Sequence, residues 1–184
     1  QPQGRDFDYL DLVMRFYRAL RQWGVSVDIV PPQPQAVSGR KLVLLPGLFA
    51  GSDALVDALA ASGAAILLGP RTGSKTADFS IADGLPPGPF RRLFDMKVRR
   101  VESLPPFVDV PLQGGGRFDG WREFLVTGAD VETRRVSADS HAAHVAKGRV
   151  HYLGGRPDAE TARVIVGELL REAGLEPREL HRDI

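Results

Sequence analysis

The sequence contains no cysteine among its 184 residues. Disulfide bridges, thiolate nucleophiles and cysteine-ligated zinc sites are therefore excluded for this chain. The sequence also lacks an apolar run of the ~20 residues that a membrane-spanning helix needs. Its first residues are polar and charged, which predicts no secretory signal peptide, and we expect no membrane partner.

An excess of charge of one sign is also lacking. The formal net charge is +1, from 24 basic and 23 acidic side chains. This balance gives no bulk attraction to a polyanion, so we expect no nucleic-acid partner. The hydrophobic content of 43% is ordinary for a globular protein. A chain of this length is expected to form one domain, residues 1–184, that buries about 70% of its unfolded surface.

The sequence is organised around the stretch from residue 41 to residue 75, KLVLLPGLFAGSDALVDALAASGAAILLGPRTGSK. Two apolar runs, residues 42–45 and 64–68, flank a predicted helix over residues 53–61 that Ser52 would cap. Strands that are apolar throughout are typical of a parallel sheet covered by helices on both faces. The stretch therefore predicts one right-handed strand–helix–strand unit.

A helix and a further strand are predicted before this unit. Apolar residues recur at intervals of three and four from Tyr9 to Trp23, and Val25, Val27 and Ile29 alternate as in a strand. A helix in an α/β layer normally crosses over from an earlier strand. The sheet is therefore expected either to begin at Val25 or to lack a strand that precedes the helix.

Short strands dominate the second half of the sequence. After a long loop over residues 72–89 and a helical turn over residues 90–94, Pro- and Gly-rich punctuation separates the following predicted strands: 96–102, 107–112, 121–126, 131–136 and 141–146. A last strand over residues 149–153 and a last helix over residues 159–173 then follow. We predict an α/β fold with a mostly parallel sheet flanked by helices and a β-rich insertion or antiparallel extension around residues 96–146.

No cofactor or metal site is expected from the motifs. The segment GPRTGSKT at residues 69–76 resembles a phosphate-binding loop, but Ser74 stands before Lys75 where that motif needs Gly. His141 and His144 would point to opposite faces of a strand, which favours surface histidines over a metal pair. His151 lies on a predicted buried strand and is expected to be a hydrogen-bonded structural residue.

No catalytic residue is expected either. A serine nucleophile needs a Gly-x-Ser-x-Gly elbow after a strand, and the two predicted strand ends, residues 46–49 and 69–73, do not contain one. The acidic residues fall mostly on predicted helix faces or turns, where solvated charge is the usual role. The sequence therefore offers no convincing catalytic arrangement.

Four segments, taken in order with a closing helix, resemble the trimerisation domain of family 42 β-galactosidases: YLDLVMRFYRALRQWGVSVDIV, KLVLLPGLF, GAAILLGPRTGSK and GRVHYLGGRPD. The resemblance covers nearly the whole chain and is strongest at residues 16–20, 69–75 and 148–154. It implies a flavodoxin-like fold akin to class I glutamine amidotransferases. Those enzymes place a cysteine at a strand–helix elbow, so their activity is not implied here.

The resemblance also implies a function. In that family, two glutamates on an upstream (β/α)8 barrel cleave the galactoside, and this chain contains neither the barrel nor the small β-domain that follows. We therefore expect a non-catalytic middle domain, excised from a longer cytoplasmic β-galactosidase that hydrolyses terminal β-D-galactosides with retention. Its expected partners are two further copies, in a homotrimer, and the catalytic barrel of its own chain.

Two other functions stay open at this point. The chain could be a free-standing flavodoxin-like module that binds a nucleotide or another anion. It could also be a degenerate amidotransferase-like enzyme with an unrecognised nucleophile.

An assembly domain needs a contact surface, and the strand ends and the β-rich region supply the candidates. Aromatic and arginine side chains are enriched at protein interfaces. The alternative is that the aromatic residues cover the domain's own core. The interface candidates are Phe49, Arg71, Lys75, Phe107, Phe118 and Trp121.

Overall fold

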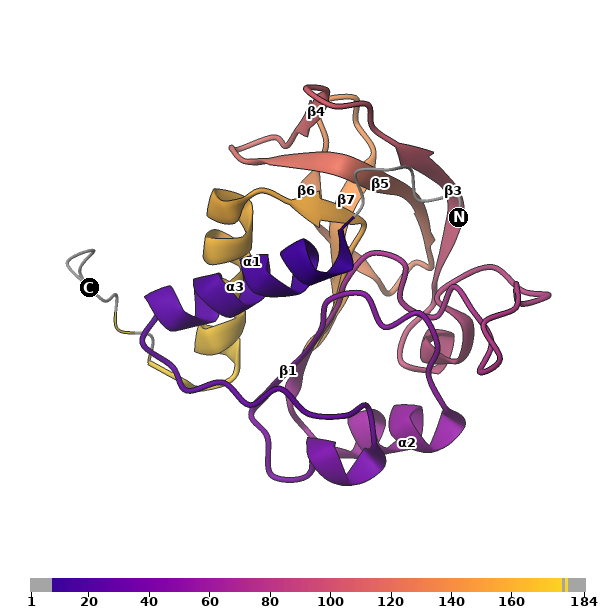
Figure 1. Ribbon diagram of the computed structural model, residues 1–184, viewed down its shortest axis with the longest axis vertical. Coiled ribbons are helices and arrows are strands. Elements are labelled where there is room, and N and C mark those ends of the chain that lie inside the picture. Colours follow the sequence, from indigo (N-terminus) through magenta and orange to yellow (C-terminus); the bar gives the residue numbers. More distant parts are fainter. Residues whose placement is uncertain (1–7, 177, 179–184) are drawn as a thin grey trace.

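The computed structural model describes residues 8–176 and residue 178 as an α/β fold with two sheets. Figure 1 shows the first sheet between α1 and α3 on one side and α2 on the other, with the second sheet beside it. In chain order the elements are α1 (Tyr9–Gln22), the 3₁₀ helix η1 (Pro34–Val37), β1 (Leu42–Leu45), α2 (Asp53–Ala61), β2 (Ala65–Leu68), the 3₁₀ helix η2 (Gly88–Arg92), β3 (Met96–Ser103), β4 (Asp109–Pro111), β5 (Arg117–Thr127), β6 (Glu132–Val136), β7 (Ala142–Lys147), β8 (Val150–Leu153), β9 (Gly155–Pro157) and α3 (Ala159–Glu172).

All three α-helices begin at an acidic or hydroxyl residue that caps their first turn. Asp8 accepts a hydrogen bond from the Leu10 N–H at 2.8 Å, and Ser52 accepts from the Leu55 N–H at 3.2 Å. Asp158 accepts from the Thr161 N–H at 2.8 Å. Such side chains satisfy backbone donors that have no partner within the helix. The predicted helix starts are therefore confirmed.

The first sheet has the strand order β1-β2-β8-β7-β6. The two apolar strands pair in parallel, Leu42 opposite Ala65, and β8 adds in parallel to β2. By contrast, β7 and β6 add as antiparallel hairpins. The prediction of a mostly parallel sheet is therefore wrong for the described chain, and the sheet is mixed. Apolar runs report burial on two faces, but they carry no information on strand direction.

The second sheet is antiparallel, with the order β3-β5-β4 and with β9 paired to β5. Residues 96–146 are therefore not one insertion, because β6 and β7 extend the first sheet while β3, β4 and β5 form the second. The three-residue strand β9 was not predicted, since its sequence Gly-Arg-Pro contains two residues that disfavour strands.

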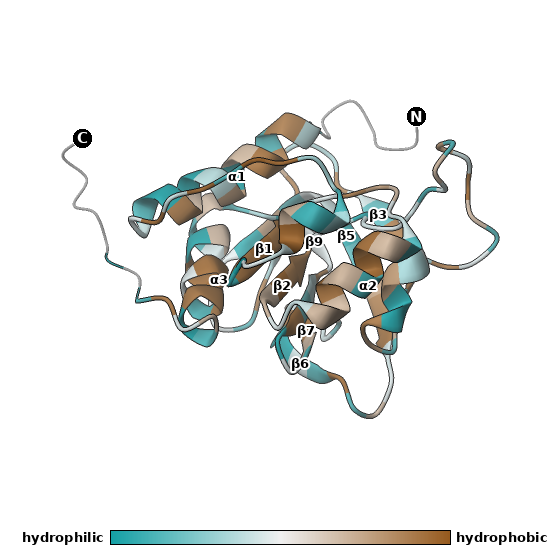
Figure 2. Cartoon of the chain, turned by 90° about the horizontal axis from the view of Figure 1, so that it is seen from below, coloured by the Kyte–Doolittle hydropathy of each residue, from teal (hydrophilic) through white to brown (hydrophobic). Residues whose placement is uncertain are grey.

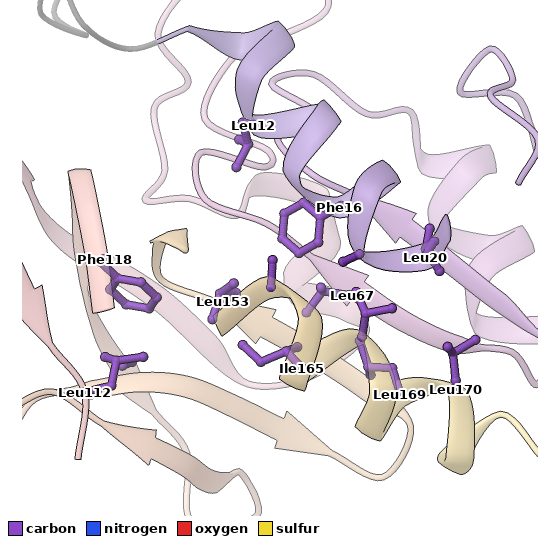
Figure 3. Close-up of a cluster of buried hydrophobic side chains, with 14 of the residues drawn as sticks. Leu12, Phe16, Leu20, Leu67, Leu112, Phe118, Leu153, Ile165, Leu169 and Leu170 are labelled. Atoms are coloured by element: carbon purple, nitrogen blue, oxygen red, sulfur yellow. The ribbon is translucent and has the colours of Figure 1, made fainter. Parts of the chain in front are cut away.

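Two hydrophobic clusters lie on opposite faces of the first sheet. One packs α1 and α3 together through Phe16, Leu20 and Ile165 (Figure 3), and the other packs α2 and β3 against β2. Figure 2 shows the apolar residues of β1 and β2 in the middle, between these helices. The predicted cover on both faces is confirmed.

Residues 25–30 do not form the predicted strand. Val25 and Val27 are half-buried and Ser26 and Asp28 are exposed, as in a strand, but no strand of the described residues pairs with them. The alternating sequence matches the burial of an extended segment in which Val25 and Val27 face inward, but the strand that it predicted is not formed. The pairing that would make it a strand is missing.

Candidate assembly surface

The loops that follow β1 and β2 are joined by backbone hydrogen bonds. The Gly73 N–H donates to the Leu48 carbonyl at 2.9 Å, and the Lys75 N–H donates to the Phe49 carbonyl at 2.9 Å. Gly73 has φ +66°, and a Cβ there would lie 1.9 Å from the Pro87 carbonyl oxygen, so only glycine fits. The fold therefore brings three sequence candidates, Phe49, Arg71 and Lys75, to one place.

Arg71 is buried between two aromatic rings. Its guanidinium carbon lies 4.7 Å from the ring centre of Phe49 and 4.8 Å from that of Trp121. Its backbone has φ +69°, and its exposed fraction is 4%. Burial lowers the pKa of this guanidinium below its ordinary value, and the charge of Glu123 opposes that change. The Arg71 guanidinium therefore makes cation–π contacts with both rings, and it links the half-buried Phe49 to Trp121 of the second sheet.

Glu123 on β5 is hydrogen-bonded to the backbone of the loop that carries Arg71. Its carboxylate accepts hydrogen bonds from the Arg71 backbone N–H at 2.9 Å, the Trp121 indole N–H at 3.2 Å and the Tyr152 hydroxyl at 2.6 Å. Burial raises the pKa of Glu123, while the three donors and Arg71 partly offset that rise. Sequence reasoning missed Glu123. The available signal was an acidic residue in the apolar strand WREFLV.

Next to Arg71 lies an apolar patch, which we define as the half-buried Phe49, the exposed Tyr9 and Phe79 whose rings lie against it, and the exposed Ile81 of the same loop as Phe79. The Phe49 ring centre lies 6.0 Å from that of Tyr9 and 6.3 Å from that of Phe79. Phe79 is 62% exposed and Ile81 is 82% exposed. Their loop, residues 72–87, projects from the molecule in Figure 1. Clustered exposed apolar residues are a feature of protein interaction sites.

The other three candidates lie apart from the exposed patch. Phe107 is fully exposed in the turn between β3 and β4, with φ +68°. Phe118 and Trp121 are 2% and 3% exposed, so they belong to the domain's own interior. Trp121 is linked to the patch only through Arg71, whose guanidinium stacks on the Trp121 ring. Neither buried ring offers area to a partner, and neither is carried into the proposal below.

The segment that resembles a phosphate-binding loop has no helix after it. Residues 74–87 form a loop, in which Lys75 makes an isolated antiparallel bridge with Ile81. No helix N-terminus therefore stands behind Lys75 to hold an anion.

The histidines form a buried hydrogen-bonded row between the first sheet and α3. Arg135 donates to His144 Nδ1 at 3.1 Å, so His144 Nε2–H donates to His151 Nδ1, also at 3.1 Å. His151 Nε2–H in turn donates to Glu172 at 2.7 Å. The structural role expected for His151 fits this row. The prediction that His144 is a surface residue is wrong, because it is 1% exposed, whereas His141 is exposed.

Burial lowers the pKa of both His144 and His151, so both rings are held neutral. Among residues 8–176 and 178 no group of three or more metal-binding side chains occurs. The same residues contain no helix long and apolar enough to span a membrane.

Comparison with known proteins places this geometry in a family. The family model described as the β-galactosidase trimerisation domain matches residues 1–176. The chain belongs to the β-galactosidase trimerisation domain family. The name of this family indicates a role in subunit assembly.

Relatives of this trimerisation domain are much longer proteins. A β-galactosidase of Thermus sp is 39% identical over 180 residues, which are 96% of this chain and 27% of that protein. A β-galactosidase of Haloferax lucentense is 35% identical over 196 residues, 100% of this chain and 29% of that protein. The trimerisation domain thus spans only about a quarter of the curated relatives that it matches.

Solved structures give the same result. The β-galactosidase of the psychrophilic Marinomonas ef1 matches with a TM-score of 0.92 at 31% identity, over 99% of this chain and 28% of that one. A glutamine amidotransferase matches with a TM-score of 0.54 at 18% identity, over 88% of this chain and 94% of that one. This second likeness concerns the fold alone.

Proposed function

We propose that this trimerisation domain is a non-catalytic part of a longer β-galactosidase and that it holds three copies of that enzyme together. The observation that carries the proposal is the family match over residues 1–176. The longer relatives are named β-galactosidases, which supports hydrolysis of terminal β-D-galactosides as the activity of the whole protein. The domain would then determine how the active sites of the three copies are arranged, and it would take no part in cleaving the galactoside.

The surface proposed for self-association is the patch of Tyr9, Phe49, Phe79 and Ile81, with Lys75 beside it. A closed trimer needs a heterologous contact, in which one surface meets a different surface of the next copy. The exposed patch supplies one apolar side of such a contact, and Phe107 is our candidate on the other. Arg71 and Glu123 would act beneath the patch, because they fix the loop that carries it.

Three further features belong to this proposal. Residues 1–184 form one domain whose other partner is the catalytic barrel of the same enzyme. The core is related to the flavodoxin-like fold of class I glutamine amidotransferases, which the parallel trio β1-β2-β8 and the amidotransferase likeness support. The cytoplasmic location rests on the family resemblance alone.

The location of the contact is tested by paired substitutions. Phe79→Ser together with Ile81→Ser removes the two most exposed side chains of the patch, whereas Val164→Ser removes an exposed apolar residue from α3 as a matched control. Sedimentation velocity should show that the double variant loses concentration-dependent association and that the control keeps it. Equal association of all three proteins would place the contact elsewhere.

A further inference from the structure

The buried histidine row takes up a further proton only by losing a hydrogen bond. Arg135 donates to His144 Nδ1, and His144 Nε2–H donates to His151 Nδ1. His151 Nε2–H donates to Glu172, so the four ring nitrogens carry two protons. A guanidinium has no acceptor. A proton added at either Nδ1 nitrogen therefore turns an acceptor into a donor that faces another donor.

His151 is the ring that takes up this proton first. Its neighbours Glu172 and Glu168 on α3 favour its charged form, while Arg134 on β6 opposes it. The ring of His144 faces neighbours that oppose a positive charge: His151, Arg135 and Arg134. Burial lowers the pKa of both rings, and these neighbours lower the pKa of His144 further. The two rings therefore differ in affinity for a proton although they are in contact.

A proton on His151 Nδ1 changes the tautomer of His144. If His144 kept its proton on Nε2, two N–H groups would face each other across 3.1 Å in the interior. Both rings are buried, so water does not satisfy these donors. If the His144 proton moves to Nδ1 instead, Nε2 accepts from His151 and the contact with Arg135 is lost. This arrangement costs less, because Arg135 is half-buried and its guanidinium can turn to water.

Loss of the Arg135 contact loosens β6, the edge strand of the first sheet. Arg135 stands opposite His144 in the ladder between β6 and β7, and the pairing register shifts on both sides of it. The guanidinium nitrogen that donates to His144 also donates to Glu168 of α3 at 3.0 Å. The ion pair between Arg134 and Glu172 is looser, at 3.8 Å. Displacement of Arg135 therefore weakens the link between β6 and α3.

We propose that the histidine row, with Arg135 and Glu172, is an acid-sensitive latch. One proton bound by His151 switches the tautomer of His144, displaces Arg135 and frees β6 from α3. Because β6 covers the outer edge of β7, its opening leaves β7 paired with β8 alone among the described strands. The latch lies within one chain, so this inference does not depend on the proposed assembly.

Nitrogen-15 NMR of the imidazole rings tests the latch, because it reports which ring nitrogen carries a proton. As the pH of the 184-residue chain is lowered from 8 to 4, His151 should become doubly protonated. Over the same range His144 should stay neutral and change from the Nε2–H to the Nδ1–H tautomer. The backbone amide shifts of residues 132–136 and 168–172 should change with the same midpoint.

Three results of this titration would overturn the proposal. His144 would keep its Nε2–H tautomer, or His151 would take up no proton down to pH 4. Alternatively, all folded signals would disappear in one step, which would show global unfolding without a local opening.

Arg135→Gln removes the positive charge that the acid form must displace, and its amide oxygen can accept from His144 Nδ1–H. The midpoint should rise by about one pH unit. His141→Gln is the matched control, because His141 is an exposed histidine between β6 and β7 and should leave the midpoint unchanged. An unchanged or lowered midpoint in Arg135→Gln would contradict the latch.

His151→Gln removes the group that takes up the proton. The amide shifts of residues 132–136 should then stay constant over the pH range in which they change in the unmodified chain. The same transition in this variant would assign the opening to another group and would overturn the proposal. If His151→Gln does not fold, the ring titration and Arg135→Gln still decide the question.

Discussion

At the scale of single residues, the surface loop depends on one buried acid. Glu123 has three hydrogen-bond donors around it, from two strands and from the loop after β2. A buried carboxylate is costly unless such donors compensate it. We therefore regard Glu123 as the residue that fixes the backbone of Arg71, and through Arg71 the position of Phe49.

Glu123→Leu should lower the free energy of unfolding by about 3–5 kcal/mol, because three buried donors lose their acceptor. Glu123→Gln should cost less, because the amide oxygen still accepts and the Tyr152 hydroxyl can turn to accept from the amide. Urea unfolding of the three proteins measures both effects. Equal stability of the leucine variant and the unmodified chain would mean that these hydrogen bonds contribute nothing.

The same residue predicts a pH dependence. Burial raises the pKa of Glu123 in the folded chain above its ordinary value of 4.5, so the folded state holds the proton more tightly than the unfolded state. The contribution to stability is present at low pH and is lost as pH rises from 4.5 through the raised pKa. The unmodified chain should therefore lose stability over this range relative to Glu123→Gln. A constant difference between the two proteins from pH 4 to pH 8 would contradict the prediction.

At the scale of elements, the histidine row couples the first sheet to α3. His144 faces Arg134, Arg135 and His151, and His151 faces Glu172 and Glu168. Burial outweighs the carboxylates and lowers both pKa values in the folded chain below 6.5. The unfolded state therefore binds more protons just below pH 6.5, and stability falls as pH drops through that value.

His144→Gln removes one of these titrating groups. Thermal unfolding between pH 5 and pH 8 should show a smaller loss of stability on acidification for His144→Gln than for the unmodified chain. Parallel pH profiles for the two proteins would show that the row does not titrate as argued.

Leu67→Asp in β2 should prevent folding, because Leu67 is 1% exposed in the middle of the sheet. An unpaired buried charge costs several kcal/mol, which is comparable with total stability. Leu44→Asp should be tolerated better, since Leu44 is only half-buried. Circular dichroism and thermal melting distinguish the two variants. A cooperative melt of Leu67→Asp at an unchanged Tm would place the core elsewhere.

The elements were largely predictable, and their pairing was not. Capping residues and hydrophobic periods located α1, α2 and α3, because these are local signals. The direction of β7 and the division of residues 96–146 between two sheets depend on long-range pairing, which local patterns do not encode. Of the interface candidates, Phe49, Arg71 and Lys75 converge because they follow adjacent parallel strands. The burial of Phe118 and the three donors that surround Glu123 depend on tertiary packing, which the local sequence does not encode.

At the scale of the whole molecule, the domain should not hydrolyse nitrophenyl galactosides. A retaining glycosidase needs two carboxyl groups about 5–5.5 Å apart at a pocket. Among the described residues, the lining of the large apolar cavity beside β1, about 500 Å³ in volume, contains one acidic residue, Asp28, and Glu123 is buried in the interior. A direct assay of nitrophenol release by the purified protein checks this prediction. Turnover that persists through repeated purification would contradict the non-catalytic role.

The proposed assembly is expected to be weak in this chain alone, because a whole β-galactosidase would add contact area outside these residues. The edge of β1 that faces away from β2 pairs with no other described strand, and such an edge favours pairing with a strand of another copy. Association should therefore appear only as concentration rises.

Multi-angle light scattering across a concentration series tests the central claim most directly. The account predicts a mass that rises from the 20.0 kDa of one chain towards three times that value, without accumulation of a dimer. A single-chain mass that persists at the highest concentration, or a tight dimer, would contradict the claim that this domain carries the trimer contact.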